Sequence, residues 1–146
     1  MKIRKIQWVN LVIALLFTPL LFAQNNKPAP GNFDRFVQEV YTGQGAKTMA
    51  EDTRRYAFMK EFYENRITFL ESDAQKLEGS NFTKLSQIPL FDDYNKGLVR
   101  DARFDPATFN PFKYRLGFYS QERQVIHVDG TKYVIVIQPQ TRRGSN

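Results

Sequence analysis

The stretch RQVIHVDGTKYVIVIQ, residues 123–138, places the dipeptide Asp129-Gly130 between two apolar segments. Asp-Gly between alternating apolar residues is the strongest short-range signal for a β-hairpin, because a type I′ turn needs positive φ at both central residues. We therefore expect two antiparallel strands, at 123–128 and 131–138.

If Asp129 and Gly130 are the only loop residues, the register places His127 opposite Lys132. Alternate residues of a strand point to opposite faces of a sheet. One face of this hairpin is apolar throughout and should pack into the core. It carries Ile126, Val128, Tyr133, Ile135 and Ile137.

A third strand is expected just before the hairpin, over residues 112–118. Apolar residues alternate there with Lys113, Arg115 and Gly117, which is typical of a half-buried strand. The three strands together would form a C-terminal meander.

Two helices are expected in the first half of the chain. In the first, capped by Asn32 and ended by Gly43 and Gly45, apolar residues fall at helical spacing. They are Phe33, Phe36, Val37, Val40 and Tyr41. The second runs over 48–65, with Thr48-x-x-Glu51 as a capping box.

The order of these elements predicts an α+β fold: two N-terminal helices packed on an antiparallel sheet that ends in a C-terminal three-stranded meander. Residues 66–70 fit either a strand or a continued helix, and 84–88 fit a short strand. Residues 72–111 are otherwise rich in loops, which is where functional insertions usually lie.

The N-terminus has the composition of an export signal. Three basic residues precede an almost wholly apolar run at 9–22, which is short for a membrane span. A retained signal anchor is the alternative. The expected division is a signal peptide at 1–23, a flexible leader at 24–31, one α+β domain at 32–139 and a loose tail at 140–146.

Composition excludes several classes of site. The chain has no cysteine, so disulfides, thiolate metal sites and cysteine nucleophiles are excluded. Removal of the signal peptide lowers the formal net charge of +6 by three, and the remaining basic residues are dispersed. This pattern argues against nucleic-acid binding. We also expect no cofactor and no membrane span after processing.

The second face of the hairpin, together with basic residues around it, is the candidate binding surface. It comprises Lys113, Arg115, Arg123, Val125, His127, Lys132, Val134 and Val136. Valines aligned between cations would suit an envelope protein or an anionic envelope polymer. The alternative is that a helix or loop covers this face, or that the valines reflect strand propensity alone.

The function expected from these observations is a secreted or periplasmic non-catalytic interaction protein, as an accessory component of an envelope assembly. The alternative is a small envelope hydrolase that uses carboxylates of the 92–110 region. The 92–110 region holds five polar residues that could serve such an enzyme: Asp92, Asp93, Asp101, Asp105 and Asn110. A cleft that contains two or more of them would favour the hydrolase.

Neither a catalytic residue nor a metal ligand is assigned. His127 is the only histidine, and its sequence neighbourhood offers no carboxylate to orient the ring. The clustered aspartates lack the spacing of a calcium loop, so we interpret them as solvated turn residues.

Cleavage after Ala23 predicts that the mature chain begins at or within a few residues of Gln24. Intact-mass spectrometry of the protein purified from its native cells measures this directly. A mature pool that retains Met1 would contradict export by cleavage.

Overall fold

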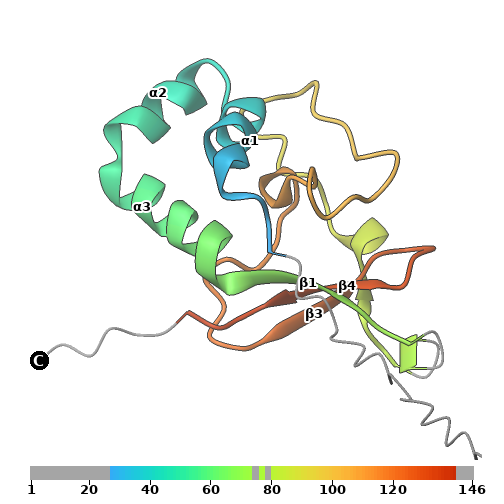
Figure 1. Cartoon of the computed structure of the whole chain (residues 1–146). Helices are drawn as coiled ribbons and strands as arrows, with labels where there is room; N and C mark the ends of the chain where they lie inside the picture. Colours follow the sequence, from blue (N-terminus) through green and yellow to red (C-terminus); the bar gives the residue numbers. More distant parts are fainter. Residues whose placement is uncertain (1–26, 74–75, 78–79, 141–146) are drawn as a thin grey trace, which may run out of the picture.

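The computed structural model describes residues 27–73, 76–77 and 80–140 (Figure 1). The expected signal peptide, the first part of the expected leader and residues 141–146 of the expected tail lie outside the described residues. Within them the chain forms helices first and a sheet second.

Helix α1 (Phe33–Val40) buries the expected apolar stripe. The cap is different from the expected one. Asn32 ends a short 3₁₀ turn, η1 (Pro30–Asn32), and makes no side-chain cap; its amide instead donates to the carbonyl of Ala107 at 2.9 Å. The residues just before α1 also belong to the fold, because Pro28 is buried and the Tyr63 hydroxyl donates to the carbonyl of Ala29 at 2.8 Å.

The expected helix over 48–65 is two helices, α2 (Gln44–Glu51) and α3 (Thr53–Glu61). Asp52 interrupts them with a non-helical backbone (φ −91°, ψ 82°) and caps α3 by accepting from the backbone of Arg55 at 3.0 Å. The expected capping box is wrong, because Thr48 lies inside α2 and its hydroxyl donates to the carbonyl of Gln44. Gly45 likewise lies within α2 rather than ending α1.

A π-helical turn, η2 (Phe62–Arg66), follows α3 and leads into strand β1 (Ile67–Glu71). The ambiguous segment is therefore a strand. The expected strand at 84–88 is shorter and earlier: β2 is Thr83–Lys84, and a 3₁₀ turn, η3 (Leu85–Gln87), follows it.

The sheet has the order β1-β4-β3-β2. Strands β3 (Gln124–His127) and β4 (Tyr133–Ile137) form the expected hairpin, and β1 pairs antiparallel with the other side of β4. Only β2 runs parallel to its neighbour, β3. The α+β class is confirmed: among the described residues, helices α1 to α3 precede a four-stranded mixed sheet.

Residues 112–118 do not form the third strand. In a meander they would pair with β3, but β2 occupies that edge of β3 instead. They begin in a 3₁₀ turn, η4 (Pro111–Lys113), and join the structure through one isolated bridge between Leu90 and Tyr114. The side chain of Asn110 accepts from the backbone of Phe112 at 3.0 Å, and this cap favours the turn over an extended chain.

The hairpin register differs from the expected one. His127 lies opposite Val134, not Lys132, because the turn is longer than two residues. The amide of Thr131 donates to the carbonyl of Val128, and within this four-residue turn only Gly130 has positive φ, at 68°. Positive φ at the third residue alone is typical of a type II turn rather than type I′. The partners shift by two residues, so the inward face stays inward.

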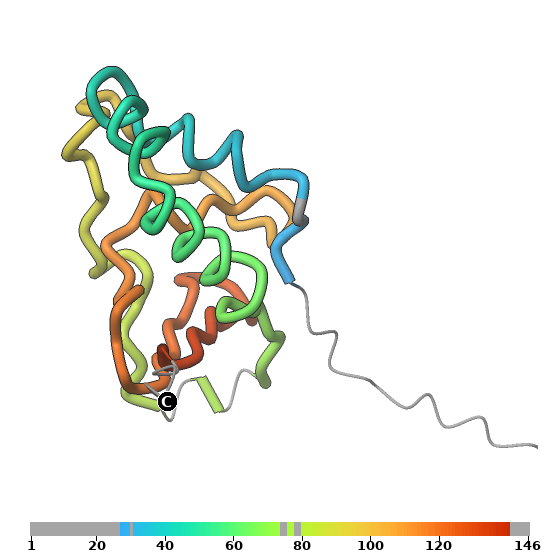
Figure 2. Tube along the Cα trace, turned by 90° about the vertical axis from the view of Figure 1, so that its left-hand side faces the viewer, coloured from blue at the N-terminus to red at the C-terminus, as the bar shows by residue number. Residues whose placement is uncertain are grey.

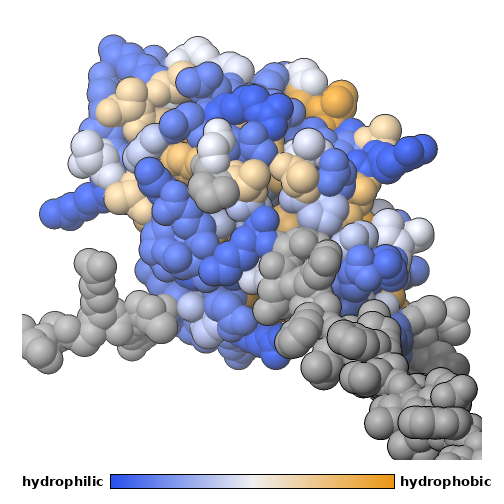
Figure 3. Space-filling model, viewed as in Figure 1, coloured by the Kyte–Doolittle hydropathy of each residue, from blue (hydrophilic) through white to orange (hydrophobic). Residues whose placement is uncertain are grey.

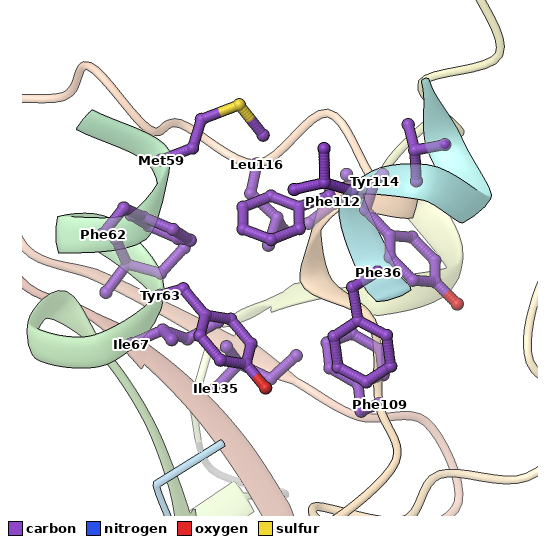
Figure 4. Packing of buried hydrophobic residues seen from close by; sticks show 14 of the residues in the cluster. Phe36, Met59, Phe62, Tyr63, Ile67, Phe109, Phe112, Tyr114, Leu116 and Ile135 are labelled. Atoms are coloured by element: carbon purple, nitrogen blue, oxygen red, sulfur yellow. The ribbon is translucent and has the colours of Figure 1, made fainter. Parts of the chain in front are cut away.

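The helices lie over one face of the sheet (Figure 2), and the main core fills the space between them. Aromatic rings from α1, η2 and the 109–114 segment gather there, beside Ile67 and Ile135 of the sheet (Figure 4). The inward residues of the hairpin, Ile126, Val128, Ile135 and Ile137, are buried in this cluster as expected.

A second, smaller cluster covers the opposite face of the sheet. The chain leaves β1 at one edge and returns in β2 at the other, and on the way Leu77 and Phe82 pack against Val134 and Val136. This contact leaves Val136 only 2% exposed. The second face of the hairpin, which carries the valines, is thus covered by a loop, as in the alternative to an open binding surface.

Replacement of Gly130 by alanine should lower the free energy of unfolding by about 1 kcal/mol, because a side chain disfavours positive φ. Gly31→Ala is the matched control. A Cβ at either site meets no atom within 4 Å, and of the two only Gly130 has positive φ. Thermal unfolding measures both variants, and equal melting temperatures would contradict the assigned turn.

Candidate binding cleft

A cleft of about 330 Å³ opens between the β3–β4 turn, η3 and the loop 100–104. These segments lie at the same side of the molecule, to the right in Figure 1. The face drawn in Figure 3 is mostly hydrophilic, and its strongest apolar colour lies at the upper right, over the loop-rich segment. The hollow between the β3–β4 turn, η3 and the loop 100–104 is called the cleft below.

The floor of the cleft is apolar and held rigidly. The rings of Phe109 and Tyr114, both buried, stack at 5.3 Å between centroids, and Phe104 lies 5.1 Å from Phe109. The Asp105 carbonyl accepts from the amide of Phe109 at 2.8 Å and fixes this bend of the loop. Leu85 and Val128 complete the floor.

Arg100 fastens the loop to η3. Its guanidinium donates to the carbonyls of Leu85, at 3.1 Å, and Ile88, and it lies over the ring of Tyr114 at 5.5 Å. Two of its nitrogens are thus used inside the fold, so we assign Arg100 a positioning role.

Asp101 at the rim already has partners. Lys113 contacts its carboxylate at 2.6 Å and that of Glu39 at 3.4 Å, and the Tyr114 hydroxyl donates to Asp101 at 3.3 Å. Burial raises the pKa of Tyr114 to about 12, so its hydroxyl stays protonated as a donor at neutral pH. Asp101 is therefore a structural carboxylate.

Asp129 ties the hairpin turn to η3. Its carboxylate accepts from the backbone and the hydroxyl of Ser86, at 2.9 and 2.7 Å. Burial raises the pKa of Asp129, but these hydrogen bonds together outweigh burial and hold the pKa below its usual value. Asp129 remains ionised at neutral pH.

Arg103 is the rim residue whose guanidinium has no polar partner among the described residues. It is exposed and lines the cleft, and no hydrogen bond or ion pair includes it within the described part of the chain. Arg103 therefore gives the rim one guanidinium whose donors remain available to a ligand.

The structure does not bring the eight predicted binding residues into one surface. Lys113 is buried at 4% exposure among carboxylates, because η4 turns its side chain inward. Arg115 pairs with Asp93 at 2.6 Å and lies over the ring of Phe91. Arg115 lines a hollow together with Val125, whereas Val134 and Val136 belong to the second cluster.

The remaining predicted residues surround the covered face. Val125 packs beside Val134 and Val136 in the second cluster. His127 contacts the carbonyl of Thr131 at 3.0 Å, and Lys132 pairs with Glu71 at 2.7 Å. Arg123 is exposed. The valines are thus part of the packing rather than an open patch.

The carboxylates proposed for a hydrolase are scattered. Asp92 contacts Lys96 at 3.3 Å, and Asp105 accepts from its own turn. The Asn110 amide donates to the carbonyl of Phe36 at 3.0 Å. Of the whole set, only Asp101 lines the cleft.

The described ranges hold neither a metal-binding cluster nor a membrane-spanning helix. No group of three or more His, Asp or Glu side chains there is arranged to hold a metal ion. No helix there has the length and apolar character that a membrane crossing requires.

Arg100, Arg103 and Phe104 were missed as site residues. The sequence did point to the loop-rich stretch 72–111 as the place for function, and a run with two arginines and a phenylalanine lies within it. These residues line one cleft with Asp129, which is distant in the sequence. Only the fold brings them together, so no local sequence pattern indicates it.

Lys113 is buried and contacts two partly exposed carboxylates, so we expect its removal to destabilise the fold. Lys113→Met leaves two carboxylates without their cation and should lower the free energy of unfolding by about 2 kcal/mol. Lys47→Met, which breaks only the exposed contact with Glu51 at 3.9 Å, should cost less than about 0.5 kcal/mol. Urea unfolding measures both, and equal losses would contradict a structural role for Lys113.

Comparison of the chain with protein-family models, with curated proteins and with solved structures found no match. No relative therefore suggests a substrate, a partner or a reaction. The functional argument rests on the geometry of the cleft and on the sequence.

Proposed function

We propose that the chain is an exported, non-catalytic binding protein that holds a ligand, or an exposed group of an envelope partner, in the cleft. The observation that carries this proposal is the cleft itself. It combines a rigid aromatic floor with one rim cation, Arg103, that has no partner among the described residues.

The size of the cleft supports ligand binding. Sites for small molecules usually measure about 300–1,000 Å³, and they combine apolar walls with a few polar groups that fix orientation. At about 330 Å³ the cleft lies at the small end of this range. It would fit one ring with a short substituent, or a single side chain of a partner.

The engagement of the acids argues for binding over catalysis. A general acid or base must be free to exchange a proton with the substrate. Asp101 is held by Lys113, and Asp129 by Ser86, and the pKa of Asp129 lies below its usual value. His127 does not line the cleft and contacts the carbonyl of Thr131.

Export is inferred from the sequence alone. The basic residues Lys2, Arg4 and Lys5 precede the apolar run at 9–22, as in a secretory signal. A location in the periplasm or outside the cell would place the cleft among envelope proteins and polymers, and these are the partners we propose.

Filling the cleft tests the proposal. Ala102 lines the cleft and is exposed, so Ala102→Trp should block the opening and leave the core intact. Ala57→Trp, on the exposed side of α3, adds the same side chain elsewhere. The mature protein and both variants would be used as baits in an envelope extract of the native cells, with captured molecules measured by quantitative mass spectrometry.

We expect at least one molecule to be captured by the parent and by Ala57→Trp, and to be depleted about ten-fold or more with Ala102→Trp. Equal capture by all three baits would contradict binding in the cleft. Chemical conversion of the captured molecule by the parent protein would contradict the non-catalytic role.

A further inference from the structure

We infer that the ligand of the cleft carries a single carboxylate joined to an aromatic group, with Arg103 binding the carboxylate and the floor binding the ring. This inference rests on the proposed function, and it adds the chemical class of the ligand. The evidence is the division of the cleft into an aromatic floor and one available guanidinium.

Arg103 suits a carboxylate because of its geometry. A guanidinium presents paired N–H donors in one plane, which match the two oxygens of a carboxylate. The donors of Arg103 are engaged in no hydrogen bond within the part of the chain that the structure describes. A ligand can therefore use them without breaking an internal contact.

A single negative charge fits better than two. The other guanidinium of the cleft, Arg100, already donates to Leu85 and Ile88. The carboxylates of Asp101 and Asp129 line the same cleft and would repel a second charge on the ligand. A phosphate dianion would meet one available cation and two acids, so a monocarboxylate is favoured over a phosphate.

An aromatic body fits the floor. Phe104 is half-buried and packs at 5.1 to 5.5 Å from the rings of Phe69, Phe109 and Tyr133, so it is held in place while part of it stays accessible. Aromatic pairs gain from offset or edge-to-face contact beyond the apolar area that they bury. A ligand ring placed on Phe104 would extend the existing cluster.

The test uses four small probes and the mature protein. The first, 3-phenylpropanoate, has the inferred chemistry. The second, 3-phenylpropanamide, has the same shape without the charge. Phenyl phosphate carries the alternative anion, and N-acetylphenylalanine presents the carboxylate as a peptide C-terminus would. Isothermal titration calorimetry or NMR shift titration measures each dissociation constant.

We expect saturable binding of the propanoate and at least ten-fold weaker binding of its amide and of phenyl phosphate. Tighter binding of N-acetylphenylalanine than of the propanoate would indicate a peptide C-terminus as the source of the carboxylate, and the reverse order would indicate a free organic acid.

Arg103→Gln should weaken binding of the propanoate about ten-fold or more and leave binding of the amide unchanged. Arg54→Gln is the matched control, because Arg54 is an exposed arginine on α3 outside the cleft. Both variants should melt as the parent does, since each replaces an exposed guanidinium by an amide. Equal affinity of Arg103→Gln and the parent for the propanoate would overturn the inference.

The two proposals fail in different ways. If the amide binds as well as the propanoate, or if no probe binds while Ala102→Trp still loses its captured molecule, the carboxylate inference is wrong and the binding role stands. If Ala102→Trp captures everything that the parent does, the binding role of the cleft is wrong.

Discussion

The burial of β4 on both faces is the constraint on which the rest of the fold depends. Its residues Val134, Ile135, Val136 and Ile137 are each at most 6% exposed. A strand paired on both edges and covered on both faces needs two separate layers of packing. The helices supply one layer, and the chain that crosses from β1 to β2 supplies the other with Leu77 and Phe82. This crossing also delivers η3 to the edge of the sheet, where the cleft forms.

Side chains rather than regular secondary structure hold the loops that form the cleft. A loop in contact with a core must still satisfy its backbone and polar groups. Arg100 satisfies two carbonyls at η3, and Asp129 satisfies the backbone of Ser86. On the inner side, Lys113 joins Asp101 to Glu39 of α1. The cleft is thus fixed to the hairpin turn, to η3 and to α1, and a ligand would meet walls that are already in place.

The parts of the fold that sequence reasoning recovered depend on local spacing. The stripe of α1 follows from residues three and four apart, and the inward face of the hairpin follows from alternation, which a register shift of two residues preserves. Where two local signals compete, local reasoning fails. Thr48 with Glu51 resembles a cap, but Asp52 is the residue that caps α3. Apolar and polar residues alternate at 112–118 because Phe112, Tyr114 and Leu116 pack into the main core. The segment begins in a 3₁₀ turn and does not pair as a strand. The continuous apolar run of β4 was itself a signal of burial on both faces.

The candidate site was out of reach of the sequence for a related reason, since its chemistry depends on which charges remain after folding. The chain carries 21 basic and 15 acidic residues, and composition treats them alike. Folding separates them: Lys113 becomes a buried structural cation, Arg100 binds carbonyls, and Arg103 remains exposed at a rigid opening. An exposed arginine loses little hydration in the free protein, whereas a ligand that buries it beside an aromatic floor meets a lower dielectric and a stronger charge. The available charge of Arg103 therefore adds little strain to the fold, and its strongest interaction would come only with a bound anion.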